Sequence, residues 1–79
     1  MNAIKLTSMI DKAIKISYSI EISSDNDTLI FIYSIGGKTY AMQFENITAI
    51  ETERDAKQLI TALQANIQYH INELENKLQ

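Results

Sequence analysis

The 79-residue sequence contains no cysteine, no proline and no tryptophan, and it has only two glycines. Without cysteine the chain can form neither a disulfide framework nor a thiolate metal site, which fits a reducing cytoplasm. The two glycines are adjacent, at Gly36-Gly37. Because glycine adopts positive φ without steric cost, the sequence places its sharpest backbone turn at this one point.

The sequence also lacks long apolar runs. No stretch approaches the roughly 18 apolar residues needed to span a bilayer, and the first five residues lack the apolar core of a signal peptide. Apolar residues are 46% of the chain and charged residues 22%, which is typical of a folded globular protein. We therefore expect one domain over residues 1–79, in the cytoplasm and without membrane contact.

Patterns that carry catalysis or bind cofactors are missing as well. His70 is the only histidine, and Glu73 is the only further ligand that its helix offers, whereas a metal or acid–base site needs several convergent groups. Gly36-Gly37 joins two predicted strands and is not followed by a helix, which excludes a phosphate-binding loop. We expect no enzymatic activity, no cofactor and no metal, and we expect His70 to be a partly exposed or interface residue.

Residues 28–44 predict a β-hairpin that turns at Gly36-Gly37. A two-residue loop pairs Ile35 with Lys38, Tyr33 with Tyr40, Phe31 with Met42, and Leu29 with Phe44. Since side chains alternate along a strand, these pairs place most of the large apolar residues on one face, which we expect to form the core. That face collects Leu29, Phe31, Tyr33, Tyr40, Met42 and Phe44.

A further strand is predicted at residues 16–22, where apolar and polar residues alternate, followed by a turn at residues 23–27. Its isoleucines reach the core face if Ser23 pairs with Thr28 across a four-residue loop, or if a longer loop contains a bulge. The opposite face of the sheet then carries an apolar strip of Ile30, Ile32 and Ala41. Either this strip is partly covered by long neighbours or by a helix, or it is a contact surface.

Helical periodicity predicts a short helix over residues 3–15, with Asn2 as its N-cap, and a long helix that starts at Thr52 and reaches residue 79. Residues 45–51 fit either a strand extension or a short turn. A helix of about 26 residues is roughly 39 Å long, whereas a seven-residue strand covers about 23 Å. The last apolar residues of the helix therefore need cover from the first helix, a second copy or a foreign partner, and these residues are Ile71, Leu74 and Leu78.

These elements predict an α+β fold, in which a three-stranded antiparallel sheet is flanked by a short N-terminal helix and a long C-terminal helix. The net charge is −3, and acidic residues dominate the middle of the chain. Because no basic patch is present, we expect no direct binding of nucleic acid. The acidic excess either keeps a small domain soluble or imitates DNA.

The layout resembles small phage- and prophage-encoded proteins, in particular the anti-CRISPR proteins that inhibit Cas9. The shared features are the order helix–strand–strand–strand–helix, a Met1-Asn2 start before an amphipathic helix, an Asp/Ser-rich first turn and a glycine-containing second turn. The second turn departs from that pattern, since Lys38 is basic. The resemblance implies an inhibitor that imitates DNA and occupies the nuclease surface that reads the protospacer-adjacent duplex. The acidic residues that would act are Asp25, Asp27, Glu45, Glu51, Glu53 and Asp55.

The sequence therefore predicts a non-enzymatic protein-binding module, a phage-derived inhibitor or modulator of a host protein such as a CRISPR nuclease. Its contact surface would combine the six acidic residues with the apolar Ile30 and Ile32 and with the end of the long helix. The alternative is a homodimer or larger homo-oligomer with a structural or assembly role, paired through that helix.

Overall fold

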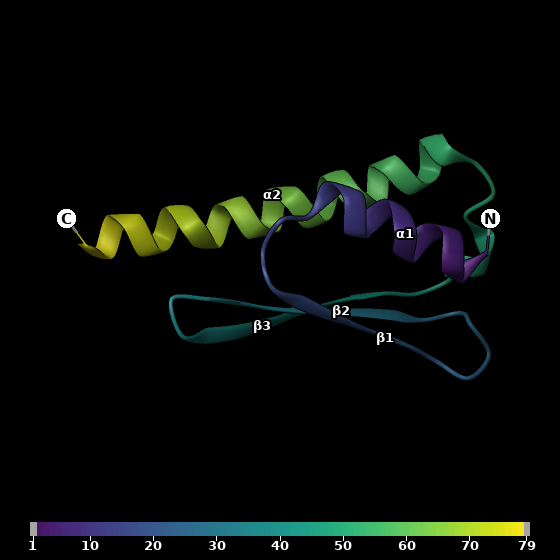
Figure 1. Ribbon diagram of the computed structural model, residues 1–79, viewed down its shortest axis with the longest axis horizontal. Helices are drawn as coiled ribbons and strands as arrows, with labels where there is room; N and C mark the ends of the chain where they lie inside the picture. Colours follow the sequence, from purple (N-terminus) through teal and green to yellow (C-terminus); the bar gives the residue numbers. More distant parts are fainter. Residues whose placement is uncertain (1, 79) are drawn as a thin grey trace.

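The computed structural model describes residues 2–78 and shows the predicted α+β fold, with both helices packed on the same face of the sheet (Figure 1). Met1, part of the Met1-Asn2 start, and Gln79, the last residue of the predicted long helix, lie outside the described residues. The elements are α1 (Ala3–Ala13), β1 (Tyr18–Ile22), β2 (Leu29–Ile35), β3 (Lys38–Phe44), the 3-10 turn η1 (Ile47–Ala49) and α2 (Glu53–Leu78).

The three strands form an antiparallel sheet in the order β1-β2-β3, and the predicted register is confirmed. Ile35 pairs with Lys38 across the two-glycine loop, and Leu29 pairs with Phe44 at the far end. Gly36 has φ +59° and Gly37 φ +82°, as a type I′ turn requires. The amide of Ser23 donates to the Thr28 carbonyl at 3.0 Å, which is the pairing that keeps the β1 isoleucines on the core face.

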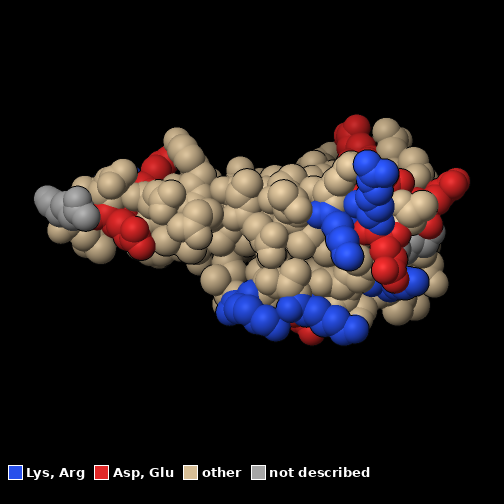
Figure 2. Space-filling model, turned by 90° about the horizontal axis from the view of Figure 1, so that it is seen from above, with Lys and Arg blue, Asp and Glu red and all other residues tan. Residues whose placement is uncertain are grey.

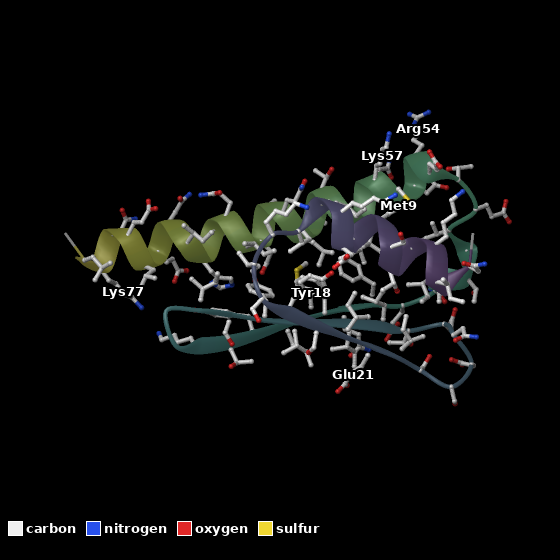
Figure 3. The ribbon with its side chains drawn as sticks, viewed as in Figure 1. Met9, Tyr18, Glu21, Arg54, Lys57 and Lys77 are labelled. Atoms are coloured by element: carbon white, nitrogen blue, oxygen red, sulfur yellow. The ribbon has the colours of Figure 1, made fainter. Side chains whose placement is uncertain are left out.

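The core lies between the inner face of β2 and the two helices. Leu29, Phe31 and Tyr33 are buried almost completely, because β2 is the central strand. The Tyr18 ring stacks on Phe31, with ring centroids 5.0 Å apart, and the Tyr18 hydroxyl donates to Asp11 on α1 at 2.7 Å (Figure 3). Burial, followed by this hydrogen bond and the nearby carboxylate charge, raises the pKa of Tyr18 to about 12. From the helices and η1 the core receives Leu6, Ile10, Ile14, Ile47, Ala56, Leu59, Ile60, Leu63 and Ile67.

The predicted first helix and first strand are each two residues too long. The first helix ends at Ala13 and not at residue 15, because Ile14 adopts an extended conformation and turns its side chain into the core. The first strand begins at Tyr18 and not at residue 16, since Tyr18 is the first residue paired with β2. Of the two structures predicted for residues 45–51, a strand extension or a short turn, the chain adopts the turn, and Ile47 is buried in η1.

The long helix α2 begins as predicted. Thr52 caps it by accepting a hydrogen bond from the Asp55 amide at 3.2 Å. The helix is the longest element of a molecule that measures 43 × 24 × 18 Å, and its C-terminal end projects past the body of the sheet (Figure 1). The predicted overhang is therefore present, and its cover is described below.

Candidate functional site

The six acidic residues predicted as contact residues come together at one end of the molecule, opposite the C-terminus (Figure 1). Three segments meet there, which are the turn between β1 and β2, the end of β3 and the start of α2. An antiparallel sheet requires the first two to share an end, so the strand order alone could have predicted this meeting. We call this region the acidic end, and define it by Asp25, Asp27, Glu45, Glu51, Glu53 and Asp55.

Two of these carboxylates have structural partners. Asp27 accepts a hydrogen bond from the Thr48 hydroxyl at 2.8 Å, and its carbonyl accepts from the Ile47 amide at 2.9 Å. Asp27 is half-buried and fastens η1 to the β1–β2 turn, a role that the sequence pattern did not indicate. The exposed Asp25 accepts from the Ser23 hydroxyl at 2.5 Å and from the Asp27 amide at 3.1 Å. These hydrogen bonds hold the pKa of Asp25 below its ordinary value.

The other four carboxylates are exposed to solvent. The Glu53 carboxylate lies 3.5 Å from the Lys5 ammonium, and both side chains are more than half exposed, so this ion pair contributes little to stability. Arg54 and Lys57 point away from the sheet (Figure 3), and acidic and basic side chains are mixed on the helical side of this end (Figure 2). Glu45, Glu51 and Asp55 thus remain available for a partner.

The sheet face turned away from the helices is open, because α1 and α2 lie together on the other face (Figure 1). Of the predicted apolar strip, Ile30 and Ile32 are half-buried and Ala41 is exposed. Within residues 2–78 no helix crosses to this side, and the cross-strand partners that flank Ile30 are Glu21 and Gln43, which have long side chains. A sheet with one solvated face is common in antiparallel folds.

The overhang of α2 is covered in part by a segment that the prediction did not consider. A Cβ atom on Gly36 would lie 2.8 Å from a methyl group of Leu74, so the β2–β3 turn supports Leu74. Ile71 is half-buried against the core. Leu78 is 78% exposed, and it is the one residue of the predicted three that lacks cover within residues 2–78.

His70 lies beside the hairpin in an aromatic cluster. Its ring stacks on Tyr40 with centroids 3.7 Å apart and planes 20° apart, and the Tyr69 ring meets it edge-on at 5.2 Å. The His70 Nδ1 atom is buried and has no hydrogen-bond partner in the described part of the chain. The prediction that His70 is partly exposed is confirmed. Its stack on Tyr40 was not predicted, because this contact depends on where α2 crosses β3.

Replacing His70 by phenylalanine is expected to stabilise the protein by about 1 kcal/mol, because phenylalanine keeps the stack on Tyr40 and removes the unpaired buried nitrogen. For a domain of this size the melting temperature should rise by roughly 5 °C, measured by circular dichroism. His70→Ala is the control, and it should melt below the wild type because the stack is lost. An unchanged melting temperature for the phenylalanine variant would show that Nδ1 is satisfied in solution.

Neither a metal cluster nor a membrane-spanning helix is present among residues 2–78. No group of three or more potential metal ligands converges there, and no helix in that range is both long and apolar enough to cross a bilayer. In comparisons with known proteins, no family model, curated protein or solved structure is significantly similar to this chain.

Proposed function

We propose that the chain is a non-enzymatic protein-binding module that contacts a basic surface of a host protein through its acidic end. The observation that carries the proposal is the convergence of six carboxylates, drawn from residues 25–55, at one end of the molecule. Three of them, Glu45, Glu51 and Asp55, are exposed and have no structural role comparable to that of Asp27. An acidic patch steers and orients association with a basic partner.

The partner class follows from the resemblance of layout to the Cas9-inhibiting proteins. A surface that carries several carboxylates competes with nucleic acid for basic grooves, so a nucleic-acid-processing effector such as a CRISPR nuclease is the proposed target. The proposed place of action is the host cytoplasm, and the proposed origin is a phage. In this role the sheet and the two helices act as a scaffold that fixes the carboxylates relative to one another.

Assembly through the long helix, the alternative, has less support. A helix pairs with a second copy through a continuous apolar stripe. Here the β2–β3 turn already covers Leu74 in part and the core covers Ile71 in part, so of the three predicted residues only Leu78 is exposed.

The proposal predicts that neutralising the acidic end weakens capture of a partner at least tenfold, because charge complementarity supports both association and orientation. The variant Glu45→Gln/Glu51→Gln/Asp55→Asn removes three exposed carboxylates and leaves Asp27 and its hydrogen bonds in place. The immobilised wild-type and variant proteins are exposed to a bacterial lysate, and the affinity for each captured protein is then measured with purified material.

The matched control, Glu21→Gln/Glu73→Gln/Glu75→Gln, changes the net charge equally but lies elsewhere on the surface. A partner retained by the wild type and the control, but lost by the acidic-end variant, supports the proposal. Equal capture by all three proteins contradicts it. Competition with duplex DNA for a panel of guide-loaded Cas9 nucleases then tests the proposed target class, and the absence of inhibition across the panel would reject that class.

A further inference from the structure

The outer edge of β3 offers unpaired backbone groups along its full length. Residues of an edge strand point their N–H and C=O groups alternately toward the neighbouring strand and away from it. Ile35 and Lys38 close the two-residue loop as a hydrogen-bonded pair, so the outward-facing residues are Thr39, Ala41 and Gln43. Among residues 2–78 none of these three amides donates to a loop or a helix.

This edge lacks the features that usually prevent pairing between sheets. Protected edges carry proline, bulges or several charges. The register of β3 is continuous from Lys38 to Phe44, and Lys38 is its only charged residue. The opposite edge differs, because β1 has five residues against seven in β3, and its Tyr18 is hydrogen-bonded to Asp11 on α1.

The flank of α2 above this edge is largely uncharged. Gln64, Ile67 and Gln68 line a surface pocket together with Ala13 at the end of α1, which places α1 on their side of α2. The opposite flank of α2, over β3, carries a row of residues spaced by three and four positions. Seen from above, the side of the molecule away from α1 shows acidic side chains toward its two ends and none in its middle (Figure 2). Charge depletion with an exposed aromatic side chain is typical of the centre of a protein interface. The flank consists of Asp55, Gln58, Ala62, Asn66, Tyr69 and Glu73.

We infer that the β3 edge binds a second copy of this chain, so that two three-stranded sheets join into one sheet of six strands. Antiparallel pairing about a two-fold axis at Ala41 places Ala41 opposite Ala41 of the second copy. The same register places Thr39 opposite Gln43 of the second copy. All three outward-facing residues of each strand then enter hydrogen-bonded pairs, and the core-side residues Tyr40 and Met42 face each other across the joint.

Charge favours this arrangement over other contacts between copies. Antiparallel pairing points the two acidic ends in opposite directions, so that they do not repel each other. A parallel contact would place the acidic ends side by side.

The β3 edge belongs to the broadest side of the molecule. In Figure 1 α1 and β1 lie on the side toward the viewer, so the β3 edge belongs to the broad face turned away. The rectangle that encloses this face is 43 × 24 Å between Cα extents, or roughly 1,000 Å², and a specific interface buries about 800 Å² on each partner. The open sheet face is smaller, since three short strands cover only about 300 Å².

A pair of charge variants tests the contact and its register. Thr39→Lys/Gln43→Lys sets like charges opposite each other twice across the proposed joint, whereas Thr39→Glu/Gln43→Lys sets opposite charges there. Both positions are exposed on the open face, so folding should not change. Sedimentation velocity from about 1 µM to about 1 mM should give twice the 9.0 kDa chain mass for the wild type. The dissociation constant of the like-charge variant should exceed that of the opposite-charge variant about tenfold.

A second variant addresses the backbone directly. Ala41→Pro removes the N–H groups at the two-fold axis and costs no bond within the chain, because this amide faces outward; proline is tolerated at such edge positions. We expect a folded monomer, and we expect Ala41→Ser to remain a dimer. In the wild type, amide exchange should slow with concentration at Thr39, Ala41 and Gln43, but not at the outward amides of the β1 edge.

A wild-type chain that sediments at 9.0 kDa over the whole concentration range overturns the inference. Equal dissociation constants for the two charge variants overturn it as well. If Ala41→Pro does not fold, the comparison of the two charge variants alone tests the inference. A dimer that survives both the like-charge pair and the proline would use another surface, which also contradicts the inference. Because the acidic ends stay free in this dimer, its failure leaves the proposed function untouched.

Discussion

Replacing Phe31 by alanine is expected to lower the free energy of unfolding by about 4 kcal/mol, because the phenyl ring fills the centre of the core. Phe31 has no exposed surface, and the centroid of its ring lies 5.0 Å from that of Tyr18 and 5.6 Å from that of Tyr33. A chain of this length has a total stability on the order of 4–12 kcal/mol. The substitution therefore removes a large fraction of the stability, and the melting temperature should fall by roughly 20 °C.

The matched control for Phe31→Ala is Ile32→Ala, one residue further along the same strand and on the opposite face. Ile32 is half-buried on the open face of the sheet, so its truncation should cost about 1 kcal/mol. Urea denaturation followed by circular dichroism measures both values. If the two variants lose equal stability, the open face is covered in solution, and the assignment of one buried and one solvated face is wrong.

The sheet could be predicted almost completely, because its information is local. Gly36-Gly37 are the only glycines and mark a two-residue turn, and strict alternation then determines which residues share a face. The pairing of Ser23 with Thr28 was one of two predicted ways to keep the isoleucines of the first strand in the core, the other being a longer loop with a bulge, and the structure has the first. One shift by a single residue would have exposed all of them, so the hydrophobic pattern selects one register.

The contacts that could not be predicted join segments that are distant in the sequence. Leu74 rests on Gly36, and this depends on the angle at which α2 crosses the hairpin, which side-chain periodicity does not specify. Asp27 binds Thr48 across 21 positions, although its place in an acidic turn suggested only a contact residue. Periodicity assigns a residue to a face, while packing decides what that face touches.

The acidic end is an intermediate case. The sequence showed an acidic middle of the chain, and the antiparallel strand order implies that the turn at residues 23–28 and the end of β3 lie together. The start of α2 joins them because η1 is tied to Asp27 by its amide and by Thr48. Topology thus accounts for two of the three segments, and tertiary hydrogen bonds account for the third.

The contact between the hairpin turn and the long helix predicts that Gly36→Ala destabilises the protein by about 2–3 kcal/mol. A left-handed conformation costs an alanine about 1–2 kcal/mol, and Gly36 has φ +59°. Its new methyl group would also lie 2.8 Å from a Leu74 methyl. Leu74 would have to rotate away from the turn, with a further loss of about 1 kcal/mol of packing.

Gly37→Ala separates these two contributions, because Gly37 also has positive φ, at +82°, but a Cβ atom there meets nothing within 4 Å. It should cost about 1–2 kcal/mol from backbone strain alone. In the Leu74→Ala background the extra cost of Gly36→Ala over Gly37→Ala should disappear, since the side chain that its methyl group displaces is absent. A double-mutant cycle based on urea denaturation measures this coupling. If both glycine substitutions cost the same in the wild-type background, Leu74 does not rest on the turn, and the C-terminal part of α2 is unsupported by the hairpin.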